Sequence, residues 1–240
     1  MSKLRSGKRY ADILTVLLVI VIIGIIALLG YFGYTAINER VIENEVADVV
    51  QEFYDNVDSD EDETDEDTTV VSLDDFNVVS SSENSTTTST SGKKKTYLDE
   101  YEVKGIIKIS KTGIEYPILE KVTVGSLSKA VGILQIATCD DITTTVTELN
   151  VPGTNALILG HNYRNGQFFS DNDQLSTGDK IEITDTSGTT VTYTIYNMYY
   201  TTPDDISFME RGLDPNTREI TLQTCNDDSS QRLIIWAKDS

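Results

Sequence analysis

Apolar residues form three patterns along this 240-residue chain, and the first is a continuous run near the N-terminus. From Ile13 to Tyr34 the chain carries 22 uncharged, mostly apolar residues. A helix needs about 20 such residues to cross a bilayer, whereas the apolar core of a cleavable signal peptide has about 7–15. The run therefore predicts a retained transmembrane anchor, which we place at residues 13–37.

The second pattern is a helical spacing of apolar residues between Val41 and Val57. It predicts a solvated helix that continues the anchor, and a short self-associating helix is the alternative. Asp58–Asp67 is almost wholly acidic and Ser80–Ser91 is nearly all serine and threonine, and neither composition can bury a core. Residues 38–95 are thus predicted to be an extracellular helix and a disordered acidic stalk, whose more apolar part, Val70–Val79, could touch the folded domain.

The third pattern begins near Tyr97, where short β-prone stretches alternate with turn-forming residues and long helical periodicity is scarce. Strands are predicted at Val103–Ile109, Ala156–Leu159, Lys180–Thr184, Thr190–Met198, Glu219–Gln223 and Leu233–Ala237. The turn residues Asp185–Gly188 join two of these strands into a hairpin. Residues 96–240 are therefore predicted to form a mainly β domain, a closed or nearly closed β-barrel with short helices in its connections.

Charge is distributed very unevenly over the chain. The formal net charge of −20 argues against nucleic acid as a partner. Residues 38–91 hold 17 acidic side chains against Arg40 alone, whereas Met1–Tyr10 holds four basic side chains and no acidic one. Basic residues favour the cytoplasmic side of a membrane. Residues 1–12 are thus predicted to be a cytoplasmic tail of a single-pass protein of the cell membrane, with the folded domain outside the cell.

Candidate chemistry is found at the ends of three predicted strands. Cys225 ends one strand and Arg232 opens the next, and a cation near a thiol stabilises the nucleophilic thiolate. His161, the only histidine of the chain, stands just past the apolar run Ala156–Leu159 in a loop position held by a strand. Any Cys–His chemistry must use His161; a satisfied structural or surface histidine is the alternative.

The second cysteine and the acidic pairs leave other interpretations open. A disulfide between Cys139 and Cys225 would consume the proposed nucleophile, whereas a lone Cys139 is small core filler. A single histidine and the lack of zinc-like Cys/His spacing exclude a histidine-based metal site, and no cofactor is expected. The pairs Asp140-Asp141 and Asp227-Asp228 could bind calcium, but without dense ligand spacing a solvated surface is favoured.

The ordered set of motifs resembles the sortases, membrane-anchored cysteine transpeptidases of Gram-positive bacteria. The resemblance extends from about Lys104 to Lys238, and the N-terminal anchor also fits it. It implies the family's eight-stranded β-barrel. The motifs that carry it are Gly105 with Tyr116-Pro117-Ile118, then Leu159-Gly160-His161-Asn162, then Phe168, Leu175 and Gly178-Asp179, and finally Thr221-Leu222-Gln223-Thr224-Cys225 with Arg232.

By this resemblance, Cys225 is the nucleophile, His161 the general acid/base and Arg232 the residue that stabilises the transition state. The thiolate would attack the carbonyl of a Thr–Gly bond in an LPxTG-like sorting signal at the C-terminus of an exported protein, leaving a thioacyl enzyme. An amine of a cell-wall precursor or a pilin lysine would then resolve the thioester. Thr224 and Asn162 are candidate contacts to the substrate or the oxyanion, and no metal ligand is implied.

Some residues depart from the family pattern. Asn162 follows the histidine where many sortases have arginine, and the surrounding sequence leans toward the B- or D-like classes. Asp75-Phe76 resembles the aromatic lid of pilus-building sortases but lacks their Asp-Pro-aromatic form. Two other functions stay open: a Cys–His peptidase that only hydrolyses, and a non-enzymatic surface-tethered β-barrel that binds partners. Transfer to an amine separates the first from a sortase, and a Cys225→Ala variant that keeps its function would indicate the second.

Overall fold

The computed structural model of the protein describes residues 3–59, 94–138, 142–143, 148–209 and 212–239. The chain divides into two compact units, Met1–Glu45 and Val46–Ser240. The predicted stalk residues 60–93, the Asp75-Phe76 motif and Cys139 lie outside the described residues.

Helix α1 (Lys3–Asp58) contributes residues to both units. From Leu14 onward it contains a stretch that is long and apolar enough to cross a membrane, and none of that stretch is buried within the protein. An exposed apolar helix of this length suggests a membrane anchor, as the sequence predicts. Which side of the membrane each end faces stays a prediction.

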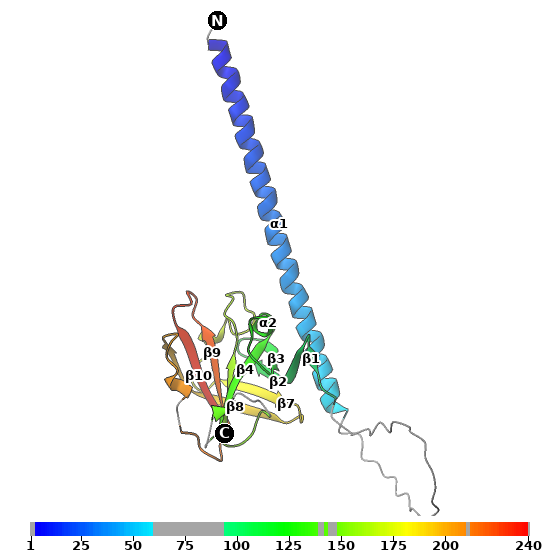
Figure 1. Ribbon diagram of the computed structural model, residues 1–240, viewed down its shortest axis with the longest axis vertical. Coiled ribbons are helices and arrows are strands. Elements are labelled where there is room, and N and C mark those ends of the chain that lie inside the picture. The colour runs from blue at the N-terminus through cyan, green and yellow to red at the C-terminus, as the bar shows by residue number, and fades with distance from the viewer. Residues whose placement is uncertain (1–2, 60–93, 139–141, 144–147, 210–211, 240) are drawn as a thin grey trace, which may run out of the picture. The chain divides into compact units, whose positions relative to one another are not determined.

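The second unit is a mainly β structure with short helices (Figure 1). Its strands are β1 (Tyr97–Leu98), β2 (Tyr101–Ile109), β3 (Ile114–Leu119), β4 (Val131–Thr138), β5 (Ile142–Thr143), β6 (Thr154–Leu159), β7 (Lys180–Asp185), β8 (Thr190–Thr201), β9 (Glu219–Cys225) and β10 (Arg232–Asp239). Its short helices are α2 (Val124–Leu127), η1 (Asn172–Gln174) and η2 (Ser207–Met209).

The sheet closes on itself into a barrel. Its pairing order is β2, β3, β4, β6, β9, β10, β8 and β7, and β7 pairs again with β2. Eight strands of the described chain therefore form the closed barrel, which confirms the predicted architecture. The β3–β4 and β6–β9 pairs are parallel and the others are antiparallel. The hairpin predicted at Asp185–Gly188 joins β7 to β8.

The barrel interior is filled with aliphatic and aromatic side chains. Those almost without solvent exposure include Ile107, Ile118, Ile133, Ile158, Ile181, Ile183, Tyr193, Ile220, Leu222 and Ile235. Burial of apolar surface on this scale is the main stabilising contribution in a closed barrel. The framework that carries the strand ends is therefore rigid.

The last turns of α1 belong to the barrel unit and pack on it. Val46, Val49 and Phe53 are 5%, 8% and 2% exposed. The Tyr54 hydroxyl donates to Glu115 Oε1 over 3.2 Å, and Asn56 Nδ2 donates to Thr96 Oγ1 over 2.8 Å. The expectation of a solvated helix is therefore wrong for this segment: its apolar stripe is buried against the same unit, which removes that surface from water.

Candidate functional site

Cys225 and Arg232 lie directly opposite each other at one end of the barrel. Cys225 is the last residue of β9 and Arg232 the first of β10, and the two are paired in the antiparallel ladder. The polar connection closes tightly, since the Asn226 amide donates to Gln231 O over 3.1 Å and Ser229 takes a left-handed conformation with φ 61°. Cys225 is half-buried and is a free thiol, so it is not consumed by a disulfide.

His161 follows β6, the neighbour of β9 on its other side. The parallel β6–β9 ladder pairs Leu159 with Gln223, and the Gly160 amide donates to Gln223 O over 3.2 Å just beyond it. His161 and Cys225 are each two residues past that last pair, which brings them to the same level. A Cβ on Gly160 would lie 2.6 Å from Phe169 Cδ2, so this close approach requires glycine before the histidine.

The side chain of Asn162 links the two loops that carry His161 and Cys225. Its Nδ2 donates to Cys225 O over 3.1 Å and to Asp227 Oδ1 over 3.2 Å, while its Oδ1 accepts from the Arg164 amide over 3.0 Å. The sequence prediction gave Asn162 as a contact to the substrate or oxyanion. That contact stays a prediction; in this structure the Asn162 amide holds the backbone of the thiol residue beside the histidine loop.

Two of the three principal candidates, Cys225 and Arg232, share one face of the sheet, and the third follows the neighbouring strand. Residues directly opposite each other on neighbouring strands point to the same side, and alternate residues of a strand share a side. By the pairing above, Cys225 and Arg232 form a row on two adjacent strands, and His161 stands beside it, two residues past Leu159 at the end of β6. Segments more than 60 residues apart in the sequence are thereby brought together, and the roles of their residues stay a prediction.

Below this row the same face is apolar. Leu157 and Ile234 are buried against Phe208 of helix η2, and Leu134, Leu159, Tyr199, Met209 and Trp236 pack around them. A floor of this kind can hold apolar side chains of an extended peptide next to the thiol. No pattern in the sequence linked η2 to the site, because its approach depends on the path of the long β8–β9 connection.

The site favours a neutral histidine and leaves the arginine unpaired with any acid. The His161 ring stacks on Tyr163 at 4.8 Å between centroids, and burial lowers the pKa of His161 below its ordinary value. Arg232 Nη1 donates to the carbonyls of Ser229 and Gln231, each over 3.2 Å. Among the described residues no carboxylate forms an ion pair with Arg232, so its charge can act on a bound anion or carbonyl.

Thr224 lies on the opposite face of β9 from Cys225. Its side chain is 5% exposed, and its Oγ1 has no hydrogen-bond partner among the described residues. Thr224 pairs with Leu233, which in turn pairs with Tyr200, so these three side chains form a second row. A substrate that contacts Thr224 would therefore lie on the opposite face of β9 from the Cys225 side chain.

That second row opens into a polar pocket of about 310 Å³, which we call the thiol pocket. Its walls are Asn162, Phe169, Ser170, Asp173, Tyr200, Thr224, Cys225, Asn226, Asp227, Asp228, Gln231 and Leu233. In the described parts of the chain, no group of three or more His, Cys, Asp or Glu side chains is arranged to hold a metal ion. The absence of a metal or cofactor stays a prediction, and Asp140-Asp141 lies outside the described residues.

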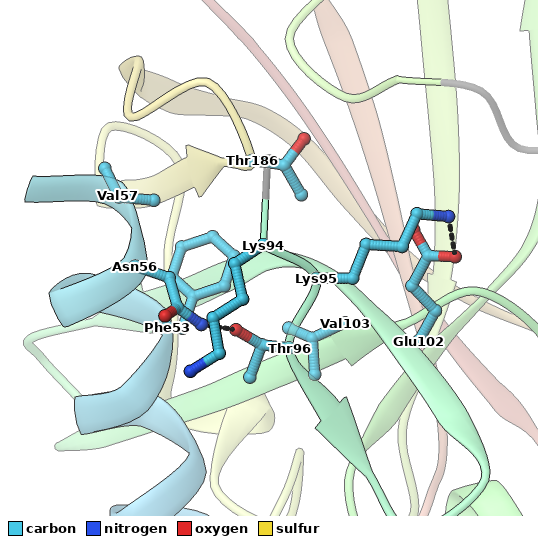
Figure 2. A pocket seen from close by; sticks show the side chains of 9 residues that line it. All are labelled: Phe53, Asn56, Val57, Lys94, Lys95, Thr96, Glu102, Val103 and Thr186. Atoms are coloured by element: carbon cyan, nitrogen blue, oxygen red, sulfur yellow. Dashed lines mark hydrogen bonds and ion pairs between the residues drawn. The ribbon is translucent and has the colours of Figure 1, made fainter. Parts of the chain in front are cut away.

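A second cavity, the helix pocket, has a volume of about 270 Å³ and lies between the end of α1 and the start of the barrel (Figure 2). It is lined by Phe53, Asn56, Val57, Lys94, Lys95, Thr96, Glu102, Val103 and Thr186. Figure 2 shows Lys95 paired with Glu102 and Asn56 bonded to Thr96. Its walls hold neither a thiol nor a histidine, and its charged side chains are in ion pairs, Lys94 with Glu52 and Lys95 with Glu102.

Comparison with known proteins gives one consistent result. A family model described as a sortase domain matches residues 107–240. Sortase A from Corynebacterium diphtheriae is 25% identical, with a TM-score of 0.50 over 59% of this chain and 62% of that one. A lid mutant of that enzyme has the same identity and TM-score, with 72% of its length covered. No curated protein sequence matches the chain.

Proposed function

Because this chain belongs to the sortase family of transpeptidases, we propose that it cleaves an LPxTG-like sorting signal of exported proteins and transfers the acyl group to an amine. The observation that carries the proposal is the convergence of three neighbouring strand ends above an apolar floor, with Cys225 opposite Arg232 and His161 just past the end of β6. A thiol, an acid/base and a fixed cation are the groups that acyl transfer through a thioester requires.

In the first half-reaction Cys225 is the nucleophile. Its sulfur attacks the carbonyl carbon of the Thr–Gly bond, and Arg232 stabilises the charge that develops on the oxygen. His161 takes the proton of the Cys225 thiol and passes it to the departing amine, so the C–N bond breaks and a thioacyl enzyme remains. The free thiol of Cys225 and the absence of a competing carboxylate at Arg232 among the described residues support these roles.

In the second half-reaction an amine from a cell-wall precursor or a pilin lysine resolves the thioester. The burial that lowers the pKa of His161 keeps its ring neutral at neutral pH, the form that accepts a proton from the attacking amine. The membrane helix would tether the enzyme, with the barrel outside the cell, where exported proteins and wall precursors meet.

The proposal is tested by incubating the full chain, in detergent, with a library of LPxTG-like peptides and a primary amine. We expect a new peptide–amine product that depends on Cys225. Hydrolysis alone, with every amine tried, would contradict transfer and favour a Cys–His peptidase. Unchanged function in Cys225→Ala would favour a binding protein instead.

A further inference from the structure

The thiol pocket carries a concentration of negative charge that the first half-reaction does not use. Asp173 from η1 and Asp227 and Asp228 from the β9–β10 connection all line it, together with Cys225. None of its lining residues, all within the described chain, is cationic. A cleft lined by one sign of charge raises the local concentration of ligands with the opposite charge.

These carboxylates are not fully compensated by the protein. Asp227 accepts one hydrogen bond from Asn162, and Asp228 accepts from the Ser230 amide over 2.9 Å. Within the described residues, Asp173 accepts no hydrogen bond and forms no ion pair. Burial is the main cause that raises the pKa of Tyr200, in the pocket wall, above its ordinary value. The negative charges of Asp173 and Asp227 raise it further.

A second, independent feature points to a polar ligand. Thr224 is only 5% exposed and belongs to the second row, which faces this pocket. Its Oγ1 has no hydrogen-bond partner in the described structure. A buried hydroxyl without a partner costs free energy unless a ligand or water satisfies it. The described carboxylates are not arranged to hold a metal ion, so an organic cation fits the pocket better.

We propose that the thiol pocket is the binding site of the acceptor substrate, and that Asp173 and Asp227 bind its amine as an ammonium cation next to Cys225. The inference rests on the proposed transpeptidase function and adds where the second substrate enters. The sorting signal occupies the apolar floor on the outer face of β9, and the amine approaches from the side of Thr224 and Tyr200. The two substrates therefore reach the sulfur from different sides.

The transfer step then balances as follows. The bound ammonium gives one proton to neutral His161, and the free amine attacks the thioester carbon. A C–N bond forms as the C–S bond breaks, and the sulfur leaves as a thiolate. The second amine proton neutralises this thiolate to the thiol, and His161 returns its proton to water.

The test compares two nucleophiles on one thioacyl enzyme formed by the full chain in detergent. N-acetyl-lysinamide carries a cationic amine at neutral pH, whereas hydroxylamine is uncharged. The ratio of aminolysis to hydrolysis is measured for Asp173→Asn and for Asp173→Asn/Asp227→Asn, because differences in the first half-reaction cancel in that ratio. Glu100→Gln, which removes an exposed charge from the β1–β2 turn, is the matched control.

We expect the ratio for N-acetyl-lysinamide to fall about tenfold in the double variant, the scale on which a charged cleft concentrates its ligand. The ratio for hydroxylamine should stay unchanged in the double variant, and both ratios should stay unchanged in Glu100→Gln. An equal loss with both nucleophiles, or no loss with either, would overturn the pocket assignment. If the unaltered chain forms no thioacyl adduct at all, the proposed function itself fails. If the adduct forms normally but its aminolysis ratio does not depend on Asp173 and Asp227, only this inference is refuted.

Discussion

The thiol pocket and the helix pocket are nearly equal in volume, about 310 and 270 Å³, yet only one is equipped for chemistry. Side chains from separate loops converge on the thiol pocket, among them Cys225 and three aspartates, and these acids are incompletely compensated. In the helix pocket Lys94 pairs with Glu52 and Lys95 with Glu102, so its charges are already matched. A cavity left where a helix packs on a barrel is a consequence of packing, whereas convergence of uncompensated polar groups indicates function.

The largest difference between the two pockets is expected when the thiol is removed. Cys225→Ala is expected to lower the transfer rate at least about 1,000-fold, because the remaining groups cannot form a thioester. Quantifying the peptide–amine product by chromatography measures the effect. Cys139→Ala is the matched control and is expected to keep its activity. Residual transfer in Cys225→Ala above one tenth of the parent rate would remove the thiol pocket from the mechanism.

The next largest effect is expected from substitution of Arg232. Arg232→Lys keeps the charge but loses the planar, multiply donating guanidinium, and should lower kcat about 100-fold with little change in KM. Arg164→Lys, an exposed arginine in the His161 loop, serves as the control. Steady-state kinetics with a fluorogenic sorting peptide separates the two constants. A rise in KM at unchanged kcat would show that Arg232 binds the ground state instead of the transition state.

The helix pocket should respond in stability and not in catalysis. Phe53 is 2% exposed, so Phe53→Ala should lower the free energy of unfolding of the barrel unit by about 3 kcal/mol, with kcat changed less than about twofold. Urea unfolding followed by fluorescence of Trp236, the single tryptophan, measures this. Gln51→Ala, on the exposed side of the same helix, is the control. A large loss of kcat with intact stability would give the helix pocket a catalytic role.

The smallest effect concerns the ring that stacks on the histidine. Tyr163→Ala exposes His161, so the pKa of His161 should rise toward its ordinary value, whereas Tyr163→Phe keeps the stack and the lowered pKa. NMR titration of the single histidine in the full chain reads this directly. Since the neutral ring accepts the amine proton, the acidic limb of the transfer rate should move to higher pH in Tyr163→Ala. A pKa that does not change would show that other groups bury His161.

The lowered pKa also has a defined effect on stability. Between the pKa of folded His161 and the ordinary histidine value, the unfolded chain binds more protons than the folded one. The contribution of His161 to stability is therefore present above the ordinary value and is lost as the pH falls toward the folded pKa. Tyr163→Ala should weaken this dependence.

The sequence predicted the principal candidate residues because each stands at the end of a strand with a clear β pattern. Cys225, Arg232 and His161 were all found in this way, and the ladder registers bring them together. The Asn162 link was not predictable, since it depends on how two loops meet. The Asp173 contribution to the thiol pocket has the same origin: nothing in the sequence relates η1 to the β9–β10 connection.

Two strands of the barrel, β3 and β4, were not among the predicted ones, and β3 shows why. Pro117 interrupts its β pattern because it has no amide to donate. The strand accommodates Pro117 since β3 joins β4 only through Ile118 and Leu119, after the proline. The packing of α1 on the barrel was missed for a different reason: the apolar stripe from Val46 to Phe53 shows that one face is buried but not what covers it.

The most direct test of the account is intact-mass analysis of the full chain after brief exposure to an LPxTG-like peptide without an added amine. The account predicts a mass increase equal to the free peptide up to its threonine less one water, carried by Cys225 after proteolysis, with release of the glycine fragment. The adduct should be lost in Cys225→Ala and retained in Cys139→Ala. Cleavage of the peptide with the acyl group found on another residue, or Cys225 that reacts with iodoacetamide no faster than Cys139, would contradict it.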